Sequence, residues 1–336
     1  MTNSAISPLS PTVQRRLSTY TGSLPVLLKK PLVKGQPIAY IGSPALGDTL
    51  IGLVTVNNLL RAGHTVDVYG DYAYALRDWF PSMRIYPAVS LDRQRELERY
   101  HTVLHMHQRP LSAALDGWHP QSVVMHHEPL SRFPIHEIDI QLLICRHHFC
   151  LESLVRSNGM QPLAGLVAGR YRNRVMIHPT SSAPEFKSWP AEKFLSLADK
   201  LHSAGYDPFF IVTREERPSW LEMAAGRFNI PPFGGLSEIA AYLYESSYFI
   251  GNDSGIGHLA SSAGVPTVSL IVRNGVIRRW RPAWATGEVI TPSPWLNPRP
   301  IREKFWKKAV SVQQVLAGLE RLMLRTGRTL SSAGRD

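Results

Sequence analysis

The chain repeats one order of apolar run, turn and helical segment, and this order limits the folds open to it. In its first occurrence, residues 37–41 form the apolar run and residues 42–47 form the turn. Apolar side chains then recur at helical spacing from position 50 to position 60, and a second apolar run occupies residues 65–69. A strand, a crossover helix and another strand are typical of a parallel sheet, because parallel strands need a long connection. We therefore expect an α/β fold.

The same alternation continues to residue 157 and starts again near residue 175. The first half adds expected helices over 72–79 and 139–157 and expected strands near 101–105 and 122–125. The second half predicts strands at 175–177, 208–212, 248–251 and 267–272, and helices at 191–204, 219–225, 236–245 and 257–262. A last amphipathic helix is expected from residue 310.

The length of 336 residues suits two domains at roughly 100 to 200 residues each. Residues 159–174, which contain Pro162 and a basic stretch, interrupt the alternation. We therefore divide the chain into four parts: a basic flexible tail over 1–34, a Rossmann-like domain over 35–168, a second Rossmann-like domain over 169–309, and a helix with a frayed end over 310–336.

Cysteine content and hydropathy exclude two classes of protein. The only two cysteines, Cys145 and Cys150, are five positions apart, which excludes a disulfide-stapled framework. No window approaches the run of about 18 apolar residues that a membrane span requires. The first residues also lack the charged-then-apolar order of a signal peptide. We expect a cytoplasmic protein.

The net charge of +11 comes from two segments. Residues 1–47 hold five basic and no acidic residues, and residues 273–308 hold nine basic and two acidic ones. These contribute +5 and +7, which leaves −1 for the rest of the chain. A neutral body argues against a nucleic-acid-binding domain. Cations mixed with aromatic residues at 278–281 and 305–308 nevertheless keep open a non-catalytic protein that binds anionic lipid or RNA.

The strongest candidate site is the segment GNDSGIGH at 251–258, between an expected strand and an expected helix. Glycines let the backbone pass close to a ligand, and the N–H groups of a helix start suit a diphosphate. A second interpretation is that Asp253 or Ser254 caps the helix. His258 can donate a hydrogen bond to a phosphate or pack in the core.

A second group of polar residues follows the expected strand at 175–177. Three hydroxyl residues come first, Thr180, Ser181 and Ser182, and Lys187 follows just before the next helix. Hydroxyls and a lysine suit an anion, because a lysine acts as a point charge for phosphate. A surface lysine beside the buried side chain of Trp189 would give the same pattern.

The turn after the first expected strand copies the glycine spacing of a phosphate-binding loop but places Asp48 where such a loop has lysine. It also lacks the glycine series of a dinucleotide-binding turn. Asp48 is therefore either a helix N-cap or a carboxylate that accepts a proton at the edge of the sheet.

Together these motifs resemble glycosyltransferase family 9, the heptosyltransferases. The resemblance rests on the glycine-aspartate turn, HPTSS at 178–182, KSWP at 187–190, NDSGIGHLA at 252–260 and GVPTV at 264–268. It covers about residues 38–322. It implies the GT-B architecture, with two Rossmann-like domains whose parallel sheets face a central cleft.

The resemblance also implies a reaction. Such enzymes transfer a sugar from a nucleotide diphosphate with inversion and without a metal ion, usually heptose from ADP-heptose to the inner core of lipopolysaccharide. No cofactor is implied beyond the nucleotide-sugar co-substrate. The implied partners are the nucleotide sugar and a glycolipid or glycan acceptor, with no specific nucleic acid. Peripheral contact with the anionic inner face of the inner membrane fits this picture.

Carried over residue by residue, the resemblance makes Asp48 the general base and Lys187 the residue that neutralises the departing diphosphate. Glu215 or Glu216 would hold the nucleotide ribose. The acceptor site would be formed by Gly47, Asp48 and Thr49. The donor site would be formed by Thr180, Ser181, Ser182, Lys187, Asp253, Ser254, Gly255, Gly257 and His258.

The chain departs from the family pattern in two places. The loop between His178 and Lys187 is longer, and residues 104–108 read LHMHQ where members often carry an aspartate and Gln-Gly. The alternatives are therefore another nucleotide sugar, or a protein or capsule acceptor.

The histidines form a separate feature. Nine of the thirteen lie between residues 101 and 148. Cys145 and Cys150 lie among them, but on a helix they would point about 140° apart, which disfavours a metal site. We favour a histidine-rich acceptor face.

Overall fold

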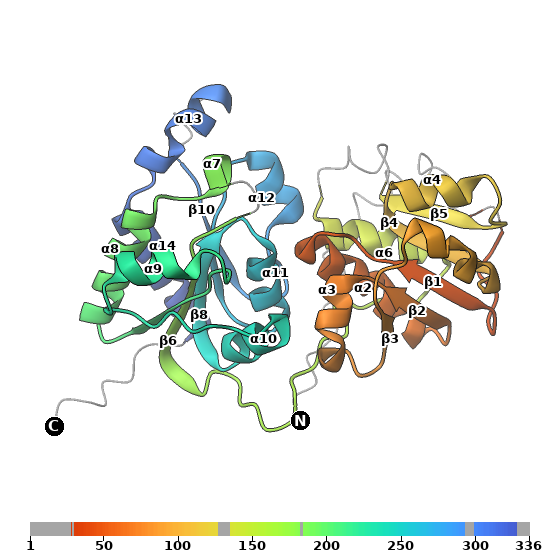
Figure 1. Ribbon diagram of the computed structural model, residues 1–336, viewed down its shortest axis with the longest axis horizontal. Helices are drawn as coiled ribbons and strands as arrows, with labels where there is room; N and C mark the ends of the chain where they lie inside the picture. Colours follow the sequence, from red (N-terminus) through yellow and green to blue (C-terminus); the bar gives the residue numbers. More distant parts are fainter. Residues whose placement is uncertain (1–27, 29, 127–134, 182–183, 293–298, 328–336) are drawn as a thin grey trace. The chain divides into compact units, whose positions relative to one another are not determined.

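The computed structural model describes residues 28, 30–126, 135–181, 184–292 and 299–327. The chain divides into two compact units, Met1–Gln161 and Pro162–Asp336, each built on a five-stranded sheet (Figure 1). Every pair of neighbouring strands in both sheets is parallel. The expectation of two parallel α/β domains is confirmed.

Unit 1 has the strand order β3-β2-β1-β4-β5. Its strands are β1 Pro37–Ile41, β2 Thr65–Tyr69, β3 Arg84–Tyr86, β4 Thr102–His107 and β5 Ser122–His126. Its helices are α2 Leu46–Arg61, α3 Asp71–Ala75, α4 Pro110–Asp116 and α6 Glu137–His147, with 3-10 turns η1 Arg77–Trp79 and η2 Leu91–Arg99.

Helices cover β1 on both faces, which explains why its sequence is apolar throughout. Ala39 belongs to a cluster that β1 and β4 form with η2 and α4. Tyr40 faces α2, where a Cβ at Gly52 would lie 1.7 Å from the Tyr40 hydroxyl oxygen. Helix α2 is buried nearly all round because α6 packs on its outer side, and there Thr55 donates to Gln141 Oε1 at 2.8 Å.

Unit 2 has the strand order β10-β9-β8-β6-β7. Its strands are β6 Tyr171–His178, β7 Asp207–Phe210, β8 Ser246–Asn252, β9 Thr267–Leu270 and β10 Gly287–Ile290. Its helices are α7 Pro184–Lys187, α8 Ala191–Ser203, α9 Arg217–Ala224, α10 Leu236–Tyr244, α11 Gly255–Ser262, α12 Asn274–Trp280, α13 Arg299–Ala309 and α14 Val312–Thr326.

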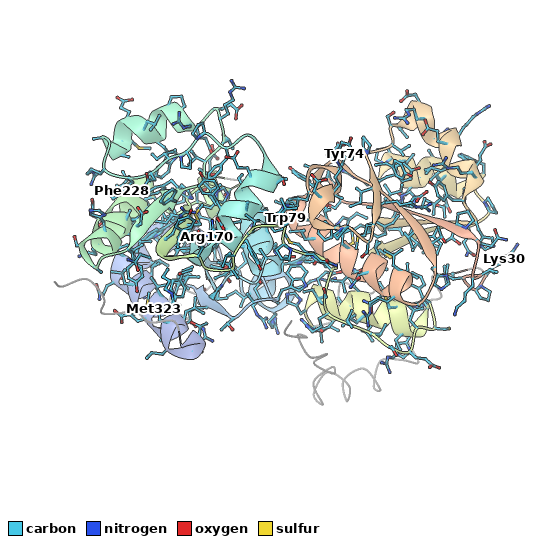
Figure 2. All side chains as sticks on the ribbon, turned by 90° about the horizontal axis from the view of Figure 1, so that it is seen from below. Lys30, Tyr74, Trp79, Arg170, Phe228 and Met323 are labelled. Atoms are coloured by element: carbon cyan, nitrogen blue, oxygen red, sulfur yellow. The ribbon has the colours of Figure 1, made fainter. Side chains whose placement is uncertain are left out.

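The expected last helix, α14, packs on the sheet of unit 2. Its buried side chains join those of α8 and the strands in one core, and the partly buried Phe228 and Met323, both labelled in Figure 2, pack against that core. Lys193 of α8 donates to backbone carbonyls at the end of α13, including that of Val310 at 2.8 Å. The hydroxyl of Ser311 accepts from the backbone N–H of Gln314, so the start of α14 is capped.

The structure differs from the sequence-based expectation at the end of α6. The helix expected over 139–157 ends at His147. Beyond it, Phe149 and Leu151 are buried and Cys150 adopts a left-handed backbone with φ 55°. The chain leaves the helix because these two apolar side chains anchor it to the core.

The boundary between the units also lies earlier than expected, after Gln161 rather than after residue 168. The intervening residues belong to unit 2 because their backbone bonds to it. The N–H of Val167 donates to Glu245 Oε1, and that of Gly169 donates to the carbonyl of Tyr244.

Part of the expected tail is ordered on unit 1. Leu28 is buried, and the backbone N–H of Lys30 donates to Gln121 Oε1 at 2.8 Å. Residues 1–27 of the tail, residue 29, and the frayed end from 328 onward lie outside the described residues.

Candidate functional site

Each sheet has one place where the strand order reverses. In unit 1, β2 and β3 lie on one side of β1 while β4 and β5 lie on the other, so the reversal falls between β1 and β4. In unit 2 the corresponding place lies between β6 and β8. Ligands of open α/β sheets bind at such points, outside the carboxyl ends of the strands. Asp48 follows β1, Lys187 follows β6 and Asp253 follows β8, so the structure places these predicted site residues at the two reversals.

In unit 2, the loop after β6 is tied to the end of β8 by Asn252. This side chain is 1% exposed. Its Nδ2 donates to the carbonyl of Pro179 at 2.6 Å, and its Oδ1 accepts from the backbone N–H of Trp189 at 3.1 Å. Ser181 and Ser188 add a hydroxyl contact of 3.0 Å across the same loop. This role of Asn252 was not expected from the sequence, although an asparagine at the end of an apolar run was a usable signal.

This arrangement brings Lys187 to the predicted donor loop, which is the segment 251–258. Its Nζ lies 3.2 Å from Asp253 Oδ2, and the two side chains are 35% and 17% exposed. Both line a small pocket with Arg273 and Glu303, which form a second ion pair at 2.7 Å. Two cations therefore line this pocket, each paired with a carboxylate.

Helix α11 begins without a side-chain cap. Ser254 occupies its N-cap position and accepts no backbone N–H. Its hydroxyl oxygen is buried and has no hydrogen-bond partner among the described residues. The capping interpretation of Ser254 is therefore wrong. The first N–H groups of α11 carry the positive end of the helix dipole toward this oxygen, which suits an anion.

The glycines of the donor loop were expected to let the backbone pass close to a ligand. Neither Gly251 nor Gly257 has a positive φ. A Cβ at Gly251 would lie 2.9 Å from the carbonyl oxygen of His178, so this glycine allows β8 to lie close to β6. At Gly257 a Cβ would make ordinary contacts, the nearest at 3.4 Å with Phe249. His258 is buried, and its ring lies edge-on to Trp284.

The remaining predicted donor residues separate into three cases. Thr180 and Ser181 lie half-buried beyond the end of β6, whereas Ser182 lies outside the described residues. The carboxylate of Glu216 stabilises a turn, since its Oε2 accepts a hydrogen bond from the backbone N–H of Thr213 at 3.0 Å. Glu215 is fully exposed, and hydrogen bonds from its own backbone and from the Thr213 hydroxyl lower its pKa. Glu215 is thus the carboxylate that the turn leaves accessible.

In unit 1, Asp48 lies in the first turn of α2. The N-cap position is Ala45, so the capping interpretation of Asp48 is wrong. Asp48 Oδ2 lies 3.0 Å from His107 Nε2, and the side chains are 29% and 23% exposed. The turn between β1 and α2 is held by Thr49, which donates to the carbonyl of Ser43 at 2.8 Å. The dipole of α2 favours a negative charge at this position.

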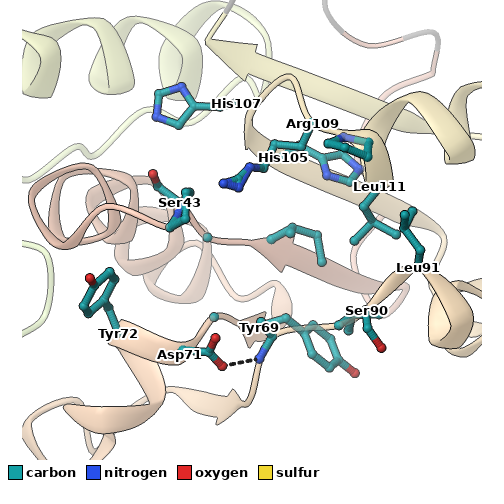
Figure 3. A pocket seen from close by; sticks show the side chains of 17 residues that line it. Ser43, Tyr69, Asp71, Tyr72, Ser90, Leu91, His105, His107, Arg109 and Leu111 are labelled. Carbon is teal, nitrogen blue, oxygen red and sulfur yellow. Dashed lines mark hydrogen bonds between the residues drawn. The ribbon is translucent and has the colours of Figure 1, made fainter.

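A cavity of about 630 Å³ opens beside this pair, at the carboxyl ends of β1, β2 and β4 (Figure 3). His105, His107 and Arg109 line it from β4 and the residues after it, and Tyr69 lines it from β2. His105 bonds to Ser122 at 3.1 Å, and burial lowers its pKa to about 4, so it is neutral at pH 7. Asp71 lies across the cavity and accepts from the backbone N–H of Ala88.

The histidine-rich segment therefore has more than one role. His105 and His107 reach the cavity, whereas His119 bonds to the carbonyl of Tyr100 and His136 accepts from the first turn of α6. Within the described ranges, no three His, Cys, Asp or Glu side chains are grouped as metal ligands. Cys145 is buried in α6, and Cys150 is exposed beyond its end.

The basic segment near α12 and α13 is partly structural. Trp306 is 1% exposed in the core of unit 2, and Arg273 pairs with Glu303. Phe305 is 42% exposed. In the described part of the chain, no helix combines the length and the apolar character that a bilayer crossing demands.

Comparison with known proteins gives a family match that covers most of the second unit. Residues 152–285 match the family described as glycosyltransferase family 9 (heptosyltransferase). This part of the chain is similar to glycosyltransferase family 9. Lipopolysaccharide heptosyltransferase 3 of Escherichia coli is 27% identical over 171 residues, which make up 46% of this chain and 48% of that protein. The matched region thus spans about half the length of this curated relative.

Two solved structures share the whole two-unit fold. The glycosyl transferase family 9 protein from Veillonella parvula DSM 2008 has a TM-score of 0.69 at 18% identity, with 87% of this chain and 98% of that chain covered. The E. coli ADP-heptose LPS heptosyltransferase II has a TM-score of 0.67 at 16% identity, with 87% and 99% covered. The expectation of two parallel-sheet α/β domains like those of heptosyltransferase structures is confirmed. Lys187 and the donor loop lie inside the family match, and Asp48 lies outside it.

Proposed function

We propose that this protein is an inverting, metal-independent glycosyltransferase that transfers heptose from ADP-heptose to a lipopolysaccharide core or a related surface glycan. One observation carries the proposal. Asn252 ties the loop after β6 to β8, and Lys187 thereby lies 3.2 Å from Asp253, directly before the uncapped start of α11. The family match and the names of the relatives supply the class of donor and acceptor.

The donor side has to bind and stabilise a departing diphosphate. The N–H groups that begin α11 and the hydroxyl of Ser254 would donate to its oxygens, and Lys187 would neutralise its charge. Lys187 would first give up part of its pairing with Asp253. A partly exposed ion pair contributes about 0–1 kcal/mol, whereas hydrogen bonds to a charged group contribute about 1.5–3 kcal/mol each. We therefore expect the diphosphate to displace Asp253 from Lys187.

The acceptor side has to remove a proton. The acceptor oxygen would attack the anomeric carbon while the bond from that carbon to the diphosphate oxygen breaks. The acceptor proton would pass to the carboxylate of Asp48, and the electron pair would leave with the diphosphate. A single displacement of this kind inverts the anomeric configuration, and the fixed N–H donors and Lys187 take the place of a metal ion. We place the acceptor in the cavity of unit 1.

Two measurements test the function. In the first, thermal unfolding is followed with ADP, UDP, GDP and CMP. We expect ADP to stabilise most, by about 2.7 kcal/mol at a hundred times its dissociation constant. Stabilisation by UDP alone would replace ADP-heptose with another nucleotide sugar.

In the second measurement, ADP-heptose is incubated with lipopolysaccharide core, capsule and protein acceptors, with and without EDTA. We expect transfer to the core acceptor, unchanged by EDTA, and NMR of the product should show the inverted anomer. Transfer only to a capsule or protein acceptor would redirect the proposal. Loss of activity with EDTA would overturn metal independence.

A further inference from the structure

The two carboxylate oxygens of Asp48 have different surroundings. Oδ2 lies 3.0 Å from His107 Nε2 and 3.5 Å from the hydroxyl of Ser43. The second distance marks a weak contact, so His107 is the main partner. Oδ1 has no hydrogen-bond partner among the residues that the structure describes. One oxygen is held, and the other is available to a ligand.

The chemistry of the pair fixes the tautomer of His107. An ionised carboxylate only accepts hydrogen bonds, so Nε2 of His107 has to carry the hydrogen. His107 is the last residue of β4, and it lies on the same face of the strand as His105 because side chains alternate along a strand. Both histidines line the cavity. The residue that donates a hydrogen bond to Asp48 therefore belongs to a strand rather than to a loop.

The position of the pair explains why two distant segments supply it. Asp48 lies in the first turn of the helix after β1, and His107 ends β4. These strands are neighbours in the sheet, with Ile41 in register with His105. The two residues are 59 positions apart in sequence. They meet at the strand-order reversal of unit 1, where a ligand is expected.

We propose that His107 is a positioning residue for the proton-accepting carboxylate. Its Nε2–H holds Oδ2 of Asp48, so that Oδ1 is presented to the hydroxyl of the acceptor. This inference rests on the proposed function, in which Asp48 takes that proton. The proton moves from the acceptor oxygen to Oδ1, the acceptor oxygen bonds to the anomeric carbon, and the diphosphate leaves with the electron pair of the broken bond.

Two variants separate positioning from a merely structural contact. His107→Ala removes the donor and should lower kcat by about 10- to 100-fold, since a misplaced catalytic group costs up to about 10²-fold. KM for the donor should not change, because the donor loop lies in unit 2. His107→Gln offers an amide N–H in place of Nε2–H, and it should restore most of kcat.

Two kinetic results would overturn the inference. They are an Ala variant with wild-type kcat and a Gln variant as impaired as the Ala variant. ADP-induced thermal stabilisation of each variant checks that it is folded.

A measurement without turnover separates this inference from the proposed function. In ¹⁵N-histidine NMR, the Nε2–H proton of His107 should be protected from exchange with water and directly visible. The signal is assigned by its absence in His107→Gln, and it should also vanish in Asp48→Ala. An Nδ1–H tautomer in the wild type would overturn the pairing. A visible Nε2–H proton in a protein that transfers no sugar from any donor would support the pairing and refute the proposed function.

Discussion

Replacement of Asn252 by alanine tests whether one buried side chain builds the donor site. The change removes both bonds that tie the loop after β6 to β8, and it leaves the carbonyl of Pro179 and the N–H of Trp189 without their partner. Both bonds are buried. A buried polar group left unpaired costs about 1–3 kcal/mol, so two such groups cost about 2–6 kcal/mol.

That cost is large against the total stability of a domain, about 5–15 kcal/mol. For a unit of this size each kcal/mol lowers Tm by about 2–4 °C, so we expect a loss of about 4 °C or more in the transition of unit 2. The loop that carries Lys187 would also lose its anchor, and ADP affinity should fall. Differential scanning calorimetry and ADP titration measure the two effects.

Asn229→Ala is the matched control. Asn229 is an exposed asparagine of the same unit, whose Nδ2 donates to Asp207 Oδ1 at 3.0 Å. Its loss should stay within about 0.5 kcal/mol, as for most surface changes. If Asn252→Ala unfolded at the same temperature as this control and bound ADP like the wild type, the argument that Asn252 anchors the donor loop would be refuted.

Four further results are expected. Asp48→Ala should abolish transfer and leave ADP binding intact, as measured by product formation and titration; normal turnover would contradict its role as base. Lys187→Ala should weaken ADP binding and flatten its dependence on salt, because a charge contact to the diphosphate is lost. Gly52→Ala should destabilise unit 1 by about 1–3 kcal/mol, because its Cβ would lie 1.7 Å from the Tyr40 hydroxyl oxygen. Adding Tyr40→Phe to this variant should restore stability, and denaturant unfolding of the single and double variants measures both effects. The free energy of unfolding should fall from about pH 6.5 toward pH 4, because the unfolded chain protonates His105 at a higher pH than the folded chain does. In unfolding measured at several pH values, His105→Gln should make this fall less steep.

The sequence predicted the strands and helices that a short run of neighbouring residues marks by its pattern of apolar side chains. The buried strands β1 and β2 are continuous apolar runs, and their predicted bounds match those of the structure. The short strand β10 was missed because its four residues include Gly287 and Glu288 and show neither the alternation of a strand nor a continuous apolar run. The end of α6 was misplaced because the buried Phe149 and Leu151 continue the apolar pattern beyond the helix.

The candidate site shows the same division. Lys187 and the donor loop were predicted because each belongs to a short motif, and the structure brings Lys187 to Asp253. The partners of His107 and Asn252 were not predicted. These partners lie 59 residues away for His107, and 63 and 73 residues away for Asn252. Pairings over such distances depend on sheet order, which no local pattern contains.

The family match covers one part of the candidate site and leaves the other part outside. The match covers residues 152–285, which include the donor loop, and it leaves Asp48 and His107 outside. Unit 1 nevertheless keeps the same strand-reversal geometry, with the cavity at its carboxyl edge. The proposed donor loop and the cavity in which we place the acceptor lie in different units. Substitutions around the cavity, such as Arg109→Ala, should therefore change KM for the acceptor while ADP affinity stays constant; a parallel loss of both would show that the two sites are coupled.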